Sequence, residues 1–266
     1  WTEGREDPMT TRIAFIVVIS LLAATVVPAS GPGHLEGYVP TAANVDGRFG
    51  SVWTTDLWIY HQGASTIHLW FNPSDGDNNE VESVVLTLEN PVTVLTNVVG
   101  ATFAADGVGS IHYLADGPVV VTSRTWTSTD PAGSYGQTIA GVPVSDAAYP
   151  DAGQAGALRM LVDQRSGFRT NLGLTNMTGV SATIEVEIFT ADGAAAPGNS
   201  SLAVEIQPYG MTQINDLLAR LPPGERAGLI VRAGVTSGEG AVLAYVSTVD
   251  NATNDASYQQ GFRFGY

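Results

Sequence analysis

Acidic side chains are concentrated in one short segment, SDGDNNEVE at residues 74–82. Oxygen ligands at alternating positions are how a calcium-binding loop begins. An EF-hand would place Gly where Glu80 stands and Glu where Leu86 stands, so that motif is absent. Two interpretations stay open, a solvated turn between strands and a calcium site. The ligands of that site would be Asp75, Asp77, Asn79 and Glu80.

The histidines offer little for metal binding or catalysis. The four are His34, His61, His68 and His112. No two stand at the H-x-x-x-H spacing of a metal site, and the chain has no Cys. A G-x-S-x-G nucleophile motif and a Gly-rich phosphate loop are also absent from the sequence. We therefore expect no enzymatic activity and no cofactor, with calcium as the one alternative.

The charge balance excludes several partners. The net charge is −15, and all 11 basic residues are Arg. A chain of this charge is repelled by nucleic acid and by anionic membrane surfaces. The absence of Cys also excludes disulfides, which favours a bacterial source for an exported protein.

Export is predicted by the residues that follow Met9. MTTR is a short positive segment, IAFIVVISLLAATVV (13–27) is an apolar stretch, and Val27-Pro28-Ala29 precede Ser30 as a cleavage site. The apolar stretch is short for a membrane span. Residues 1–29 are therefore interpreted as upstream residues and a signal peptide, and the protein as secreted, periplasmic or on the cell surface.

The rest of the chain contains an internal repeat. WTTDLWIY (53–60) matches FRTNLGLT (168–175), and STIHLWFNPSDG (65–76) matches ATIEVEIFTADG (182–193). Further matches follow in the same order, including GPVVVTSRTW (117–126) with GAVLAYVSTV (240–249). Such an ordered series indicates a duplication. The predicted units are residues 35–147 and 157–266.

Each unit is predicted to be all-β. In TIEVEI (183–188) apolar and acidic residues alternate, which is typical of a half-buried strand. One short helix is expected in each unit, at NDLLARL (215–221) and more weakly at NVVGATF (97–103). Many short strands with turn signals between them favour a sandwich. The predicted fold is two tandem immunoglobulin-like β-sandwiches.

The segments SVWTTDLWIYHQG, GFRTNLGLTN and SYGQTIAGVP resemble a repeat found in exported proteins of high-GC bacteria. In that family an aromatic-Arg-Thr-Asp/Asn-Leu phrase opens a β-sandwich unit. The resemblance covers most of residues 35–266 and implies location and fold, without implying an activity. The first copy departs from the phrase by having Thr54 where the second has Arg169.

Aromatic residues distinguish the first copy from the second. Strand alternation places Trp58 and Tyr60 outward, where the second copy has Gly173 and Thr175. His68 and Trp70 also point outward in the next strand. If 53–60 and 65–71 form a hairpin, Trp58 lies near His68, and Asp56 lies near Trp70. The candidate contact residues are Asp56, Trp58, Tyr60, His68 and Trp70.

This patch leaves three explanations open: burial inside the molecule, a protein partner or self-association, and a platform on which sugar rings stack. The leading expectation is an exported, non-enzymatic binding, adhesive or cell-envelope structural module. A carbohydrate-binding protein that uses the patch is the first alternative. A hydrolase with a site between the two units is the second, because a Ser-His-Asp site can form from distant residues.

Overall fold

The computed structural model describes residues 33–47, 50–129, 133–150 and 156–263. The predicted signal peptide lies outside these residues. Most of the described chain is in antiparallel strands, so the predicted all-β, sandwich-like class is confirmed. The described residues belong to one compact unit, and the boundaries 35–147 and 157–266 stay a prediction.

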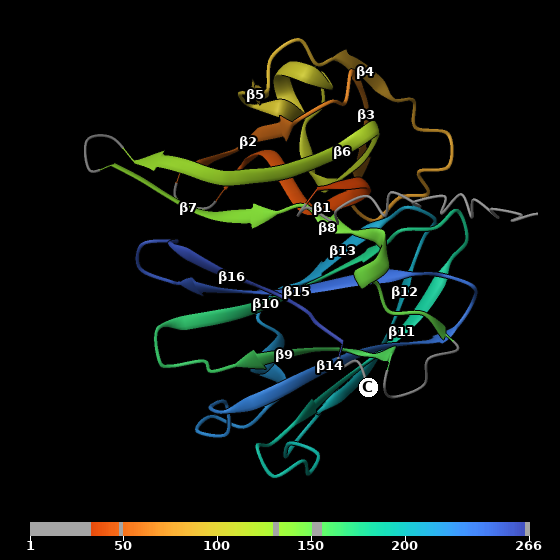
Figure 1. Ribbon diagram of the computed structural model, residues 1–266. Helices are drawn as coiled ribbons and strands as arrows, with labels where there is room; N and C mark the ends of the chain where they lie inside the picture. The colour runs from red at the N-terminus through yellow and green to blue at the C-terminus, as the bar shows by residue number, and fades with distance from the viewer. Residues whose placement is uncertain (1–32, 48–49, 130–132, 151–155, 264–266) are drawn as a thin grey trace, which may run out of the picture. The chain divides into compact units, whose positions relative to one another are not determined.

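The first half of this unit carries eight strands, coloured red to green in Figure 1. They are β1 (His34–Asp46), β2 (Val52–His61), β3 (Thr66–Pro73), β4 (Val84–Thr87), β5 (Val92–Leu95), β6 (Gly107–Thr129), β7 (Gly133–Ala140) and β8 (Val142–Pro143). The helical turns are η2 (Val98–Thr102) and η3 (Val144–Asp146). Hydrogen bonds join all eight strands into one sheet.

The second half carries the strands coloured green to blue (Figure 1). They are β9 (Leu158–Val162), β10 (Phe168–Asn176), β11 (Ala182–Phe189), β12 (Ser201–Ile206), β13 (Met211–Ile214), β14 (Leu229–Ser237), β15 (Val242–Asp250) and β16 (Ala256–Gln260), with the 3-10 turn η5 (Leu217–Arg220). They form two sheets, ordered β13-β10-β15-β16 and β12-β11-β14-β9. Apolar side chains from both sheets form one core cluster.

The strands of the two halves pair in the same order. In the first half β5-β2-β6-β7 corresponds to β13-β10-β15-β16, and β4-β3-β6-β1 corresponds to β12-β11-β14-β9. The 23-residue strand β6 thus takes the place of both β14 and β15. This repeated order is what a duplication predicts, while the duplication itself and the immunoglobulin-like connectivity stay predictions.

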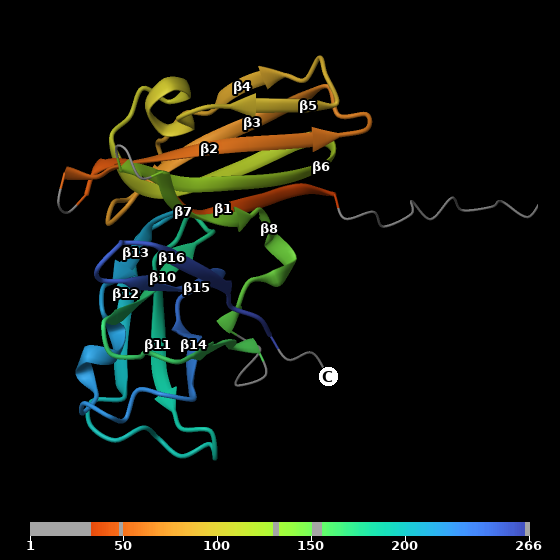
Figure 2. The same cartoon turned by 90° about the vertical axis from the view of Figure 1, so that its left-hand side faces the viewer.

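Strand β6 passes from one set of partners to the other at residues 116–118. Ala115 pairs with β3, and Val119 pairs with β2. Asp116 holds this bend, because its carboxylate accepts hydrogen bonds from the backbone and hydroxyl groups of both Ser65 and Thr66. These four hydrogen bonds stabilise the charged form and hold the pKa of Asp116 well below its usual range. Figure 2 shows β6 running beside β2 along much of its length.

Both predicted helical segments are present. The prediction at 215–221 corresponds to η5, and the one at 97–103 corresponds to η2. The residue before each turn has a positive φ, 44° at Asn97 and 48° at Asp216. Asn and Asp tolerate this left-handed conformation better than most residues do.

A third apolar cluster joins the two halves. Its buried members are Tyr38, Val142, Ala147, Met177, Ala241 and Leu243. Strands β1 and β10 also meet directly, because the Thr175 hydroxyl donates a hydrogen bond of 3.1 Å to the carbonyl of Pro40. The second half therefore packs on the first through the outer face of the sheet that contains β10 and β15.

Candidate functional site

The predicted aromatic patch is divided between two strands that do not pair. Strand β2 pairs with β1, β5 and β6, and β3 pairs with β4 and β6, so the hairpin expected between 53–60 and 65–71 is wrong. Leu57 and Ile59 of β2 share one core cluster with Ile67 and Leu69 of β3. The outward side chains of the two strands therefore point away from each other. Asp56, Trp58 and Tyr60 form one group, and His68 and Trp70 another.

The first group includes an exposed apolar surface, which we call the β2–β5 face. Trp58 lies directly opposite Val94, and Tyr60 directly opposite Val92. The exposed fractions are 41% for Tyr60, 50% for Val92 and 51% for Val94, while Trp58 is half-buried. Two neighbouring cross-strand pairs thus present a continuous apolar surface to solvent.

The corresponding face of the second half is covered. Gly173 and Thr175 occupy the positions of Trp58 and Tyr60, and Met211 lies opposite Thr175 as Val92 lies opposite Tyr60. All three of these second-half residues are buried. Thr175 is covered by β1 of the first half, and Met211 forms a parallel bridge with Ser74.

The acidic loop at 74–82 provides this cover. The backbone N–H of Asp75 donates to the carbonyl of Met211 at 2.9 Å, and the Asp75 carboxylate accepts a hydrogen bond from Thr212 at 2.8 Å. The Asn78 amide reaches the carbonyls of Pro73, Gly76 and Tyr209. The start of this loop is thus a docking segment between the halves.

Three of the four candidate calcium ligands, Asp75, Asp77 and Asn79, are used in this docking and in the turn itself. Asp77 accepts a hydrogen bond from the backbone of Asn79, whose amide donates to the carbonyl of Gly179. Glu80 is exposed. Among the described residues no group of three or more His, Asp or Glu side chains is placed to hold a metal ion.

Asp56 has a structural partner on each carboxylate oxygen. Oδ1 accepts from the backbone N–H of Asn97 at 2.9 Å, and Oδ2 accepts from the indole N–H of Trp126 at 2.8 Å. In the second half Asn171 accepts in the same way from the backbone N–H of Asp216. The Asp/Asn of the repeated phrase therefore fixes the left-handed residue that opens each helical turn.

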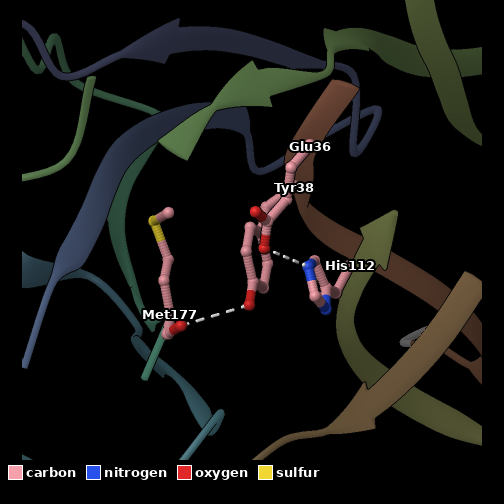
Figure 3. A network of polar contacts seen from close by, with 4 residues as sticks. All are labelled: Glu36, Tyr38, His112 and Met177. Carbon is pink, nitrogen blue, oxygen red and sulfur yellow. Dashed lines mark hydrogen bonds and ion pairs between the residues drawn. The ribbon is translucent and has the colours of Figure 1, made fainter. Parts of the chain in front are cut away.

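The second group continues into a stack of four rings on the outer face of β3, β6 and β1. His68 lies 5.8 Å from Trp70, Trp70 4.7 Å from His112, and His112 4.4 Å from Tyr38, with all three pairs stacked. Figure 3 shows Tyr38 between His112 and Met177. Its hydroxyl donates to the carbonyl of Met177 at 3.3 Å, which ties the stack to the second half.

Burial and one carboxylate set the charge of this stack. Burial lowers the pKa of His112 below its ordinary value, and the hydrogen bond of 2.9 Å from Nε2 to Glu36 opposes part of this effect. Burial also raises the pKa of Tyr38 far above its usual range. At neutral pH His112 and Tyr38 are therefore both uncharged.

A hollow of about 200 Å³ opens beside this stack, and we call it the Trp70 hollow. It is lined by Trp70, Asn72, Asn78, Asn79, Val81, His112 and Tyr209. Only Trp70 and Asn79 of these were candidates from the sequence, and the other five residues were missed. The one available signal for Asn72 was its outward position two residues after Trp70. Tyr209 comes from the other half of the chain and gives no local signal.

Comparison with known proteins adds no family. The sequence matches no family model, and a search of curated proteins finds no significant match. The resemblance to the exported bacterial repeat stays an expectation from the residues quoted above. Within the described residues no helix is long and apolar enough to span a bilayer.

Proposed function

We propose that the protein is an exported, non-enzymatic cell-envelope or adhesive module that binds a second copy of itself through the β2–β5 face. One observation carries this proposal: the corresponding face of the second half is buried by the first half, whereas the β2–β5 face is uncovered. A contiguous exposed apolar surface on a soluble domain is typical of an interaction site. Export rests on the signal-peptide pattern.

The internal docking also suggests which surface of the second copy takes part. The first half covers β13 with the segment that begins at Ser74. The sequence repeat aligns Asp75-Gly76 with Asp192-Gly193, so the equivalent segment in the second half is 190–194, which forms an exposed turn. A second copy would lay this turn along β5, as Ser74 and Asp75 lie along β13.

Such a contact uses different surfaces on the two copies. Interfaces of this kind close into rings or extend into open filaments, depending on the rotation between copies. An extended chain of copies fits an adhesive or envelope role better than a soluble dimer does. It also leaves the Trp70 hollow available, since that hollow lies over β3 and the first part of β6, away from β2 and β5.

The test replaces two residues of the β2–β5 face by their second-half counterparts. Tyr60→Thr copies Thr175, and Val94→Gln copies Gln213. We expect the unaltered chain to self-associate in sedimentation velocity experiments, and the double variant to associate about tenfold more weakly, a change of about 1.4 kcal/mol. Both new side chains suit an exposed strand, so the fold should be retained.

A valine outside the face provides the matched control. Val85 is 54% exposed on β4, which pairs with β3 and not with β2 or β5, so Val85→Thr should leave association unchanged. The proposal fails if the unaltered chain stays monomeric at all concentrations, or if Val85→Thr weakens association as much as the double variant does.

A further inference from the structure

We infer that the Trp70 hollow is a binding site for one neutral saccharide ring. This site lies apart from the β2–β5 face, so the inference does not rest on the proposed self-association. The hollow combines an indole and an imidazole ring with three asparagine side chains. Its volume of about 200 Å³ lies below the roughly 300–1,000 Å³ of pockets for drug-sized ligands, which suits one small ring.

An amide without a hydrogen-bond partner in the described part of the chain is the first reason. Asn72 is only 2% exposed, and its side chain shares the outward face of β3 with Trp70 and lines the hollow. Within the described residues no hydrogen bond is formed by this amide. The amide oxygen and nitrogen of Asn72 are not among the fully buried unsatisfied atoms, so they reach the open space of the hollow and can bond to whatever occupies it. A ligand in the hollow would satisfy both ends of the amide.

A second unsatisfied group lies next to the first. Ser110 of β6 is directly opposite Asn72, and its buried hydroxyl also has no partner in the described part of the chain. By contrast, Asn78 and Asn79 use their amide N–H groups on carbonyls of the turn and of the second half. Among the three asparagines of the hollow, Asn72 on β3 is therefore the one whose amide is unused, and the unpaired Ser110 hydroxyl lies beneath the surface beside it.

The aromatic rings and the lack of charged side chains in the hollow favour a neutral sugar as the ligand. A sugar hydroxyl is both donor and acceptor, as the free amide of Asn72 requires. Trp70 adds an apolar ring surface against which sugar C–H groups can pack. Apart from His112, which is held uncharged by burial, no ionisable acid or base other than the Tyr209 phenol lines the hollow. An ionised ligand would find no counter-charge, so a neutral sugar is favoured over an acidic or amino sugar.

One lining residue is held under backbone strain. Tyr209 has a φ of 49°, in the left-handed region that costs a non-glycine residue free energy. Its backbone N–H donates to Thr178, and its carbonyl accepts from Asn78. Contacts from both halves therefore hold Tyr209 against the hollow, and backbone strain maintained in this way is typical of ligand-binding positions.

The test is isothermal titration calorimetry of the full chain with methyl glycosides of glucose, galactose and mannose, and with N-acetylglucosamine. Glucuronic acid and glucosamine provide charged counterparts, and adenosine provides a neutral ring of another class. We expect at least one neutral saccharide to bind, and both glucuronic acid and glucosamine to bind at least tenfold more weakly than it does. Asn72→Leu should weaken binding of the neutral saccharide at least tenfold.

Two further variants keep the result interpretable. Trp70→Phe preserves a ring against His112 while reducing the apolar surface, and should also weaken binding. Asn90→Leu makes the same chemical change at an exposed position outside the hollow, and should leave binding unchanged. Binding of no saccharide in the panel, equal binding by Asn72→Leu, tighter binding of the charged sugars or binding of adenosine alone would each overturn the inference.

Discussion

At the scale of single residues, the repeated Asp/Asn acts as a structural acceptor in both halves. Asp56 and Asn171 each accept the backbone N–H of a residue with positive φ, and Asp56 also binds the indole of Trp126. Asp56→Ala removes both acceptors, so we expect a loss of about 1–3 kcal/mol in the free energy of unfolding. Asp56→Asn keeps one acceptor oxygen and should cost less. Urea denaturation of the three proteins measures both changes.

The comparison between the two variants is decisive for this role. If the carboxylate served a ligand instead of the fold, Asp56→Ala would leave stability unchanged within error. Asn171→Ala gives an independent check, because Asn171 supports one backbone N–H and has no counterpart of Trp126. It should therefore cost less than Asp56→Ala does.

His112 should make stability depend on pH. Its folded-state pKa is lowered mainly by burial, so below about pH 6.5 the unfolded chain binds a proton that the folded chain does not. The stabilising contribution is therefore fully present above this pH and is lost as the pH falls. The groups that face the ring are Glu36, Tyr38 and Trp70.

The measurement is the difference in unfolding free energy between the unaltered chain and His112→Gln, followed from pH 8 to pH 5. We expect the advantage of the unaltered chain to shrink as the pH falls, by at most about 1.4 kcal/mol per pH unit for one proton. Carboxylates are present in both proteins, so their contributions to the pH dependence cancel in the difference. A difference that stays constant over this range contradicts the assignment.

At the scale of elements, the strand pairs β2–β6 and β10–β15 occupy equivalent positions in the two halves. A large aromatic ring lies on β2 in the first pair and on β15 in the second. In the second half Tyr245 of β15 lies over Gly173 of β10, and a Cβ on Gly173 would overlap the tyrosine ring. In the first half Trp58 of β2 lies opposite the smaller Thr122 of β6. The second half therefore has Gly where the first has Trp58, because the facing strand carries Tyr245 in place of the smaller Thr122.

The close approach of the Tyr245 ring to Gly173 predicts that substitutions at the two positions have non-additive effects on stability. Gly173→Ala should destabilise the chain by about 1–3 kcal/mol, because the ring must move within a packed interface. In a Tyr245→Ala background the same change should cost nothing or stabilise slightly, since alanine suits a strand better than glycine does. A double-mutant cycle by thermal or urea unfolding measures this interaction. Additive effects would mean that Tyr245 does not restrict Gly173.

The elements also show where sequence reasoning succeeds and fails. Alternation placed Trp58, Tyr60, His68 and Trp70 on the outward faces, and the residues between them do lie in the core. The helical segments predicted at 97–103 and 215–221 are found as η2 and η5. The hairpin prediction failed because the short link between β2 and β3 joins two strands that pair with different parts of β6 and not with each other. Alternation predicts which face of a strand each side chain lies on, but it does not predict which strand pairs with which. The change of partners along β6 at Asp116 also leaves no periodic pattern in the sequence.

At the scale of the whole molecule, the contacts between the halves determine which surfaces remain free. The acidic loop resembled a calcium site because its acids stand at alternating positions, yet Asp75 and Asn78 bind the second half. Local sequence could not reveal this, because the partners lie more than 130 positions away. The same docking buries the Gly173 face and leaves the β2–β5 face uncovered.

The direction of the proposed self-association can be tested by cross-linking, since the chain contains no Cys. Inside one chain Ser74 bridges Met211, and the corresponding residues are Ala191 in the second-half turn and Val92 on β5. We therefore expect Val92→Cys and Ala191→Cys chains to form a disulfide-linked dimer when mixed under mild oxidation. Each variant alone should stay mostly uncross-linked, because equal surfaces do not meet in a head-to-tail contact. Equal dimer formation by either variant alone would instead indicate a two-fold symmetric contact and overturn the head-to-tail arrangement.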